Sequence, residues 1–167
     1  MTALTISDER FLRRAIELSR HALEDQGKTP FGAILVRGNE VIGEGTSCVI
    51  ELSDPSAHAE VMALRDAGKN LRRHLFEDSA LYASSEPCPM CLAACYWARV
   101  PRVVFAASSA DVASYGFEDL QLYRELHQPA EHRSIREESA SEPLRGEAAA
   151  VLRAWAETLP EPVEPKV

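Results

Sequence analysis

The sequence predicts an α/β fold, in which helices pack against the faces of a sheet. The run at 103–107 is wholly apolar, as is typical of a strand buried on both faces. Segments with helical spacing of apolar residues alternate with such strand-like runs, and this alternation indicates a layered sheet. A chain of 167 residues with 46% apolar residues can bury a core of ordinary size. We therefore expect a single domain over 1–159.

The first elements are predicted to be a helix and a hairpin. Apolar residues recur at helical intervals over 8–25, and acidic residues at the start of this segment suit a helix N-terminus. An apolar run at 31–36 is followed by turn residues at 37–40 and by a second run that extends to Val49. Two such runs around a turn are typical of a β-hairpin.

In the middle of the chain, the pattern of residues changes from one typical of a strand to one typical of a helix and back. Residues 54–56, Asp-Pro-Ser, have the cap and early proline of a helix start, which predicts a helix over 56–68 with His58 in its first turn. A short strand is expected at 80–83 and a helix at about 89–98, before the apolar strand described above.

The pattern weakens after residue 108. A segment of mixed character reaches residue 126, a polar stretch covers 127–142, and a last helix is expected at about 144–158. The segment 160–167 is rich in proline and glutamate, so it cannot continue a helix and is expected to be extended or disordered.

The charge balance argues against nucleic acid as a partner. The chain has 18 basic and 26 acidic residues, which gives a net charge of −8, and most of such a surface repels a polyanion. Its one basic cluster contains no aromatic residue on which a nucleotide could stack, so we interpret it as a solvated helix end. The cluster consists of Lys69, Arg72, Arg73 and His74.

A cytoplasmic location is expected, without a membrane partner. The first 20 residues carry several charges, unlike the apolar centre of a signal peptide, and no stretch approaches the roughly 18 apolar residues of a membrane span. In a reducing compartment, cysteines serve as thiols or metal ligands rather than as disulfides. The chain has four, at Cys48, Cys88, Cys91 and Cys95.

Two short segments together predict a metal site. Cys88 and Cys91 are three residues apart at the start of a helix, so both sulfurs can face one point. His58 and Glu60 are two apart, about 200° around a regular helix, and can converge only ahead of its first turn. Two helix N-termini are therefore expected to aim at one metal ion, with His58, Cys88 and Cys91 as ligands at roughly 2.0–2.3 Å.

Three protein ligands leave a fourth position for water, which is typical of a hydrolytic rather than a structural zinc site. Zinc lowers the pKa of bound water to about 7, and Glu60 lies close enough in sequence to take and deliver its proton. A lone Cys-x-x-Cys is more often structural or redox-active, and it is the combination that favours catalysis. Cys95 could be proposed as a fourth ligand, but we expect it to be a small buried hydrophobic residue.

These residues, His58-x-Glu60 and Pro87-Cys88-x-x-Cys91, resemble the zinc deaminases of the cytidine deaminase-like fold. The resemblance covers roughly 8–130. It implies a three-layer α/β/α fold with a central mixed five-stranded sheet and one Zn²⁺ per chain. It also implies that water replaces a ring amino group by a carbonyl and that ammonia is released.

Within this fold, residues 30–33, 54–60 and 86–91 resemble the branch that contains bacterial guanine deaminases and tRNA adenosine deaminases. The segments 116–119 and 123–131 are similar to the guanine deaminase side, where an acidic residue meets the purine. By this resemblance Glu118 is expected to be catalytic and Asp119 to bind substrate, with the assignment between the two open. Both could instead simply cap a helix.

The resemblance also implies further contacts with the substrate. The family usually places an Asn that binds the substrate ring at the position of Ser47, which is shorter and cannot offer a paired donor and acceptor. Trp97 matches a family aromatic that could stack on a flat ring, although core packing would explain it as well. The full expected set of substrate-binding residues is Phe31, Ser47, Ala57, Trp97 and Asp119.

The function that the sequence favours is hydrolytic deamination of a free nucleobase, guanine in the first place, by a homodimer. Cytosine, isocytosine and the amino-triazine ammeline remain alternatives as substrate. A tRNA adenosine deaminase and a non-catalytic zinc-binding scaffold are weaker alternatives. Exchange of C-terminal segments between subunits is left open, because Trp155 matches the family's C-terminal helix while 160–163 lack the aromatic that reaches the partner's site.

Overall fold

The structure, a computed structural model, describes residues 4–25 and 27–161. The chain divides into two compact units, Met1–His127 and Gln128–Val167. The first unit holds the sheet and every residue expected at the site. The single domain expected over 1–159 stays a prediction. Residues 162–167 of the expected tail lie outside the described residues.

The sheet of the first unit is mixed, as expected. Its strand order is β2-β1-β3-β4, in which β1 is antiparallel to β2 and to β3, and β4 is parallel to β3. The expected hairpin is confirmed, but Val49 starts a short helix, α2 (Val49–Leu52), instead of extending the second strand. The strands are β1 (Gly32–Arg37), β2 (Glu40–Thr46), β3 (Ser79–Ser85) and β4 (Arg102–Ala107).

The described part of the chain forms four strands in this sheet, so the expected number of five is wrong. Immediately after β4, Ser108 and Asp111 form a reciprocal capping box that starts α5 (Ser109–Ser114), and α6 (Asp119–His127) follows. The chain therefore turns into helices where a fifth strand would begin. As a result β4 lies at the edge, and the side chain of Phe105 is 41% exposed, although the apolar run predicted a strand buried on both faces.

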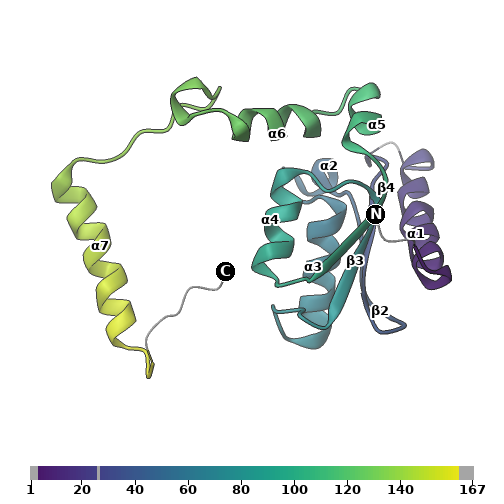
Figure 1. Cartoon of the computed structure of the whole chain (residues 1–167), viewed down its shortest axis with the longest axis horizontal. Helices are drawn as coiled ribbons and strands as arrows, with labels where there is room; N and C mark the ends of the chain where they lie inside the picture. Colours follow the sequence, from purple (N-terminus) through teal and green to yellow (C-terminus); the bar gives the residue numbers. More distant parts are fainter. Residues whose placement is uncertain (1–3, 26, 162–167) are drawn as a thin grey trace. The chain divides into compact units, whose positions relative to one another are not determined.

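Helices cover both faces of the sheet, which confirms the three-layer α/β/α arrangement (Figure 1). The helix α1 (Ile6–Ser19) packs on one face, and α3 (Ala59–Leu71) and α4 (Pro89–Trp97) lie on the other. The side chains of β1 alternate between the two cores. Ile34 and Val36 join the cluster with α1, whereas Ala33 and Leu35 join the cluster that contains the alanines of α3 and Cys95 of α4.

A close approach between β2 and α3 fixes the position of the helix that carries the site. A Cβ atom at Gly45 would lie 2.2 Å from the carbonyl oxygen of Ala59 and 2.4 Å from the backbone nitrogen of Ala63. Only glycine permits this spacing, because any other residue would push α3 away from the strand. The first turn of α3 is therefore held directly against β2.

An ion pair between a half-exposed arginine and a buried carboxylate ties α1 to the sheet. Arg102 on β4 donates two hydrogen bonds, of 2.6 and 3.0 Å, to the carboxylate of Asp8, whose side chain is 3% exposed. Tyr82 on β3 donates a third, of 2.7 Å. Because these donors favour the charged form, Arg102 first and then Tyr82, the pKa of Asp8 lies well below its usual value.

The helix boundaries differ modestly from those expected. The helix predicted over 8–25 starts earlier, capped by Thr5, and continues beyond Ser19 as a short 3₁₀ helix, η1 (Arg20–Leu23). The helix predicted over 56–68 starts three residues later, because the Asp54 carboxylate accepts hydrogen bonds from the Ser56 backbone and hydroxyl and holds a turn there.

The second unit contains η2 (Ala130–His132) and the expected last helix, α7 (Glu142–Glu157). Several large apolar side chains of α7 are exposed. Across the described ranges of both units, no helix is both long and apolar enough to span a membrane.

Candidate metal centre and catalytic cavity

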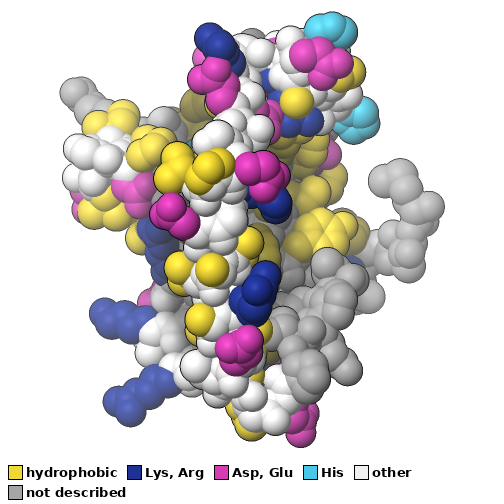
Figure 2. Space-filling model, turned by 90° about the vertical axis from the view of Figure 1, so that its left-hand side faces the viewer, with side chains coloured by type: hydrophobic (Ala, Val, Ile, Leu, Met, Phe, Trp, Pro, Cys, Tyr) yellow, Lys and Arg dark blue, Asp and Glu magenta, His cyan; other side chains and the backbone are white. Residues whose placement is uncertain are grey.

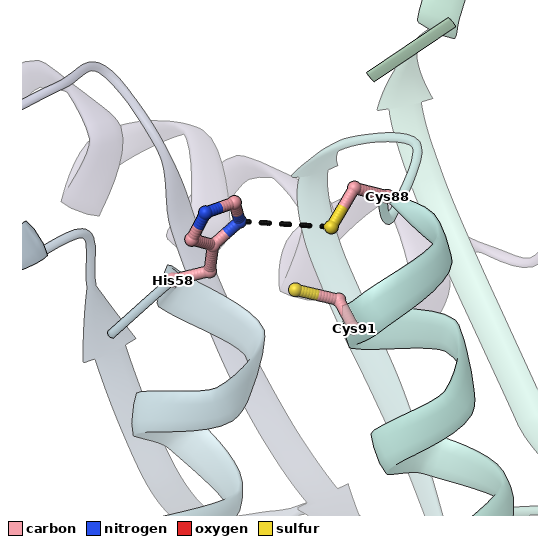
Figure 3. Close-up of side chains that lie close together, drawn as sticks. All are labelled: His58, Cys88 and Cys91. Atoms are coloured by element: carbon pink, nitrogen blue, oxygen red, sulfur yellow. Dashed lines mark hydrogen bonds between the residues drawn. The ribbon is translucent and has the colours of Figure 1, made fainter. Parts of the chain in front are cut away.

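The N-termini of two helices bring three ligating side chains together (Figure 3). His58 is the residue that precedes α3, and Cys88 precedes α4, both with extended backbone (ψ of 157° and 167°). Pro89 follows as the first residue of α4, where its missing N–H costs no helical hydrogen bond. Cys91, one turn into α4, points toward the same place as the other two side chains.

The three side chains fit a zinc ion in identity and spacing. One ligand atom from each of His58, Cys88 and Cys91 lies within 4.8 Å of the others, and His58 Nδ1 is 3.7 Å from Cys88 Sγ. A tetrahedral zinc ion with bonds of about 2.0–2.3 Å separates its ligand atoms by roughly 3.3–3.8 Å. Two sulfurs and one imidazole are a typical donor set for zinc, and these residues would hold it.

The site favours a thiolate at Cys88. Hydrogen bonds from Cys91 and, secondarily, from His58 lower the pKa of the Cys88 thiol to about 4. The pKa of Cys91 is raised, because it donates the bond to Cys88 and because it is buried. One sulfur is thus already anionic, and binding of a metal would release the proton of the other.

Glu60 is buried beside these ligands, with only 6% of its surface exposed. Burial raises the pKa of its carboxyl group, and a hydrogen bond with Cys91 opposes this shift. Glu60 therefore lies next to the metal ligands without being one of the three.

Two of the three ligands, His58 and Cys88, line a cavity of about 200 Å³. Half-buried Asp119, at the start of α6, lines it, and the pKa of its carboxyl group is raised by burial and then by the negative charge of Cys88. The cavity is lined by groups from the loop before β1, from the residue after β2, from the end of β3 and from the starts of four helices, α2, α3, α4 and α6. Its lining residues are Thr29, Phe31, Ser47, Val49, Ile50, His58, Glu60, Ser85, Cys88, Phe117 and Asp119.

Most of the expected substrate-binding residues meet at this cavity. Phe31, Ser47 and Asp119 line it, and Ala57 is fully buried next to His58, where its carbonyl oxygen accepts a hydrogen bond of 2.9 Å from the backbone of Cys48. The sequence left the choice between two acidic residues open, and the one that faces the cavity is Asp119.

Two expected site residues lie outside the cavity lining. Trp97 is the last residue of α4, six positions beyond Cys91, which puts it about 9 Å along the helix from the metal ligands. Its side chain is 73% exposed. Glu118 is exposed and does not line the cavity, because the chain enters α6 at Asp119 with only one of the two carboxylates turned inward.

Several lining residues and two supporting residues were not among the site residues expected from the sequence. Thr29 and Phe117 line the cavity, and the ring of Phe117 packs edge-on against Phe31 at 4.8 Å between centroids. Glu86 accepts a hydrogen bond of 2.7 Å from the backbone of Ser109, and Tyr123 donates one of 2.8 Å to the carbonyl of the residue before Cys88. No local pattern marks these residues, since each contact joins distant segments.

A larger cavity of about 360 Å³ adjoins the first and shares Phe31, Ser85 and Phe117 with it. Its lining is mostly apolar and includes neither Glu60 nor any of the three metal ligands. The smaller cavity is therefore the one lined by Glu60 and by two of the candidate metal ligands, His58 and Cys88.

Comparisons with known proteins agree with this geometry. Residues 5–107 match the family described as the cytidine and deoxycytidylate deaminase zinc-binding region. A guanine deaminase from Bacillus subtilis (strain 168) is 45% identical over 130 residues, which are 78% of this chain and 83% of that protein. The X-ray structure of guanine deaminase from Bacillus subtilis is similar with a TM-score of 0.85 and 38% identity, covering 95% of this chain and 98% of that one.

A tRNA-specific adenosine deaminase from Haemophilus influenzae is also similar. It is 43% identical over 110 residues, which are 65% of this chain and 63% of that protein. This match spans less of both chains than the match to the guanine deaminase.

Proposed function

Because the chain belongs to the cytidine and deoxycytidylate deaminase zinc-binding family, we propose that it is a zinc-dependent aminohydrolase that converts guanine and water to xanthine and ammonia. The observation that carries the proposal is the meeting of Glu60, His58 and Cys88 in one small cavity. The choice of guanine is supported by the 45% identical guanine deaminase and by the acidic group at Asp119.

The proposed reaction needs a group that moves protons beside the reacting carbon. Zinc, when bound, supplies a water that is deprotonated near neutral pH. The Glu60 carboxylate takes the proton of this water and delivers it to the ring nitrogen next to the amino-bearing carbon. The water oxygen would bond to that carbon, and its remaining proton would pass through Glu60 to the amino nitrogen, so that the carbon–nitrogen bond breaks, ammonia leaves and a carbonyl remains.

Asp119 is proposed to orient the base. A guanine ring presents a ring N–H and an exocyclic amine, and each loses free energy if it is buried without an acceptor. The Asp119 carboxylate lines the cavity and can accept from both. In this proposal Asp119 takes the role for which the sequence left Glu118 as the alternative.

The volume of the cavity and the net charge of the chain favour a free base over a nucleic acid as the substrate. A cavity of about 200 Å³ lies below the roughly 300–1,000 Å³ that are usual for sites of drug-sized ligands, so it suits a single small ring system. The net charge of −8 opposes binding of a polyanion. A tRNA substrate is accordingly the weaker candidate.

We also propose that the enzyme is a cytoplasmic homodimer, in which C-terminal segments could be exchanged. A helix that exposes several large apolar side chains is usually covered by a partner surface. In Figure 2 such side chains lie between acidic and basic ones along the helix that faces the viewer. A reducing compartment would keep the thiols of Cys88 and Cys91 available for zinc. The exposed apolar residues of α7 include Leu144, Val151, Leu152 and Trp155.

Ammonia release by the zinc-loaded chain tests the proposed reaction and substrate. The panel contains guanine, cytosine, isocytosine, ammeline, adenine, guanosine and an adenosine-containing tRNA anticodon stem. We expect the highest kcat/KM for guanine. Activity led by a pyrimidine or triazine would refute guanine as the substrate, and activity led by the tRNA would refute the free-base assignment.

The proposed dimer is tested by its mass in solution and by mixing two inactive chains. One carries Glu60→Ala, and the other ends after residue 127. Recovery of activity in the mixture would support sites that need a partner's C-terminal segment, whereas a monomeric mass at micromolar concentration would contradict the dimer.

A further inference from the structure

Two hydroxyl groups on the wall of the catalytic cavity form a pair. Thr29, in the loop before β1, donates a hydrogen bond of 2.7 Å from Oγ1 to Oγ of Ser47, just beyond β2. Both residues line the same cavity as Glu60 and His58. Their contact joins positions that are 18 residues apart, so it exists only because the hairpin of β1 and β2 brings the two loops together.

The backbone holds this pair in place. The N–H of Ser47 donates a hydrogen bond of 3.2 Å to the carbonyl of Phe31, and the N–H of Cys48 donates one of 2.9 Å to the carbonyl of Ala57, the residue before His58. Ser47 is only 2% exposed. The pair is therefore fixed relative to the start of α3, where the first metal ligand lies, and loses little conformational freedom when a ligand binds.

After the hydrogen bond between them, the two hydroxyl groups still have a donor and an acceptor with which to bind a ligand. A hydroxyl group offers one proton and two lone pairs. Oγ of Ser47 accepts the proton of Thr29, and among the described residues its own proton has no acceptor, while Oγ1 of Thr29 keeps its lone pairs. The pair can therefore present a donor and an acceptor side by side, which Ser47 alone cannot do.

We propose that Thr29 and Ser47 act as one hydroxyl pair that recognises a hydrogen-bond acceptor on the substrate ring, which makes Thr29 a specificity residue for the deamination. This inference rests on the proposed function and adds a requirement to it. The base must offer N–H groups to Asp119 and also a carbonyl oxygen or an unprotonated ring nitrogen to the pair. Guanine satisfies both conditions, with its N1–H and amine on one side and with O6 and N7 as acceptors.

The requirement is tested with hydroxyl-deleted variants and acceptor-deleted bases. Thr29→Val removes the hydroxyl at nearly constant shape, Thr29→Ser retains it, and Thr46→Val is the matched control, because Thr46 is a neighbouring threonine outside the cavity lining. Each variant is assayed on guanine, on 7-deazaguanine, which lacks the N7 acceptor, and on 6-thioguanine, whose sulfur accepts weakly. Both analogues keep the N1–H and the amine.

We expect Thr29→Val to lower kcat/KM on guanine about 10-fold, the size of one hydrogen bond, while Thr29→Ser and Thr46→Val stay within about twofold of the parent. On one of the two analogues the loss shrinks to less than about threefold, because the acceptor that the pair contacts is already missing. The double variant with Ser47→Ala should lose little more than Ser47→Ala alone, since the two hydroxyls act together.

Different results separate the failure of this inference from the failure of the proposed function. If the parent chain deaminates guanine but Thr29→Val behaves like Thr46→Val, the hydroxyl pair is refuted and the function stands. Equal losses on all three bases would show a structural role and also refute it, as would a loss that Thr29→Ser does not rescue. A parent chain that deaminates none of the bases would overturn both the hydroxyl pair and the proposed function. Zinc content and melting temperature would confirm that this chain was folded.

Discussion

The hydroxyl of Tyr123 donates a hydrogen bond of 2.8 Å to the carbonyl oxygen of Pro87, the residue before the metal ligand Cys88. Tyr123 lies one turn beyond Asp119 on α6, so this bond ties the helix that carries the proposed substrate-binding carboxylate to the loop that carries a sulfur ligand. The hydroxyl of Tyr123 therefore helps to fix the distance between the proposed substrate-binding carboxylate and the candidate metal ligand Cys88.

Replacing Tyr123 by Phe should raise KM more than it lowers kcat. Loss of one hydrogen bond costs about 1 kcal/mol, and we expect kcat/KM on guanine to fall roughly fivefold while the zinc content stays unchanged. Steady-state kinetics on guanine measure the split. Tyr96→Phe, at an exposed tyrosine on α4, is the matched control. Equal values of kcat and KM for the two variants would argue against a role of the Tyr123–Pro87 hydrogen bond in positioning the site.

Zinc stoichiometry should distinguish the two cysteine ligands from Cys95, the next cysteine along α4. Cys88→Ser and Cys91→Ser should bind far less than one zinc per chain, measured by atomic emission after dialysis. Cys95→Ser should retain it, because Cys95 is a buried residue of the core and burial raises the pKa of its thiol to about 12. Loss of zinc in Cys95→Ser without a loss of folding would contradict this assignment.

Replacing Glu60 by Gln should remove turnover and leave the metal. A positioned acid and base contributes about 10²–10⁴-fold to a rate, so kcat on guanine should fall by at least about 100-fold. Glu40→Gln, at the exposed first residue of β2, is the control and should match the parent. A Glu60→Gln chain that holds zinc and still turns over at more than a tenth of the parental rate would rule out the proposed proton transfer.

The ion pair of Asp8 should make stability depend on pH in the acid range. Its pKa is lowered in the folded state, first by Arg102, so its contribution is complete above the unfolded value of about 3.9 and is lost as the pH falls below that toward the folded value. At pH 7, Asp8→Asn should reduce the free energy of unfolding by about 1.5–3 kcal/mol. Urea titrations should show the difference between parent and variant shrinking below about pH 4, and a difference that stays constant down to pH 3 would disprove the linkage.

Replacing Gly45 by Ala should disturb both stability and the metal site. The new Cβ would lie 2.2 Å from the carbonyl oxygen of Ala59, so α3 must shift, at a cost of roughly 1–3 kcal/mol. Because α3 starts next to His58, zinc affinity should fall as well. Gly146→Ala is the control, since a Cβ there meets nothing within 4 Å and a helical position favours alanine. Equal melting temperatures for the two variants would contradict the close approach.

The metal ligands could be predicted from the sequence because their geometry is local. Cys88 and Cys91 are one helical turn apart, and His58 and Glu60 sit at a helix start, so spacing alone limits where their side chains can point. The layered fold could be predicted for a similar reason, because the spacing of apolar residues within each segment distinguishes strands from helices. The boundaries of helices and strands that were predicted from the spacing of nearby residues agree with the structure to within a few residues.

The expected five-stranded sheet is wrong. The capping box of Ser108 and Asp111 that starts α5 is local, but the place of β4 at the sheet edge depends on how distant strands pair. The place of Trp97 outside the cavity lining depends on where α4 ends relative to the site, and the inward turn of Asp119 rather than Glu118 depends on how α6 packs. A residue's neighbours along the chain do not determine these outcomes.

By itself the sequence determined the layered α/β class, the three candidate zinc ligands and the place of Glu60 beside them, because each follows from periodicity or from spacing within one helical turn. The tertiary structure alone decided which side chains complete the cavity, the pairing of Thr29 with Ser47 above all. The physical reason is that such a hydrogen bond needs its two atoms within about 3 Å, and residues 18 positions apart reach that distance only when the sheet and the loops around it have formed.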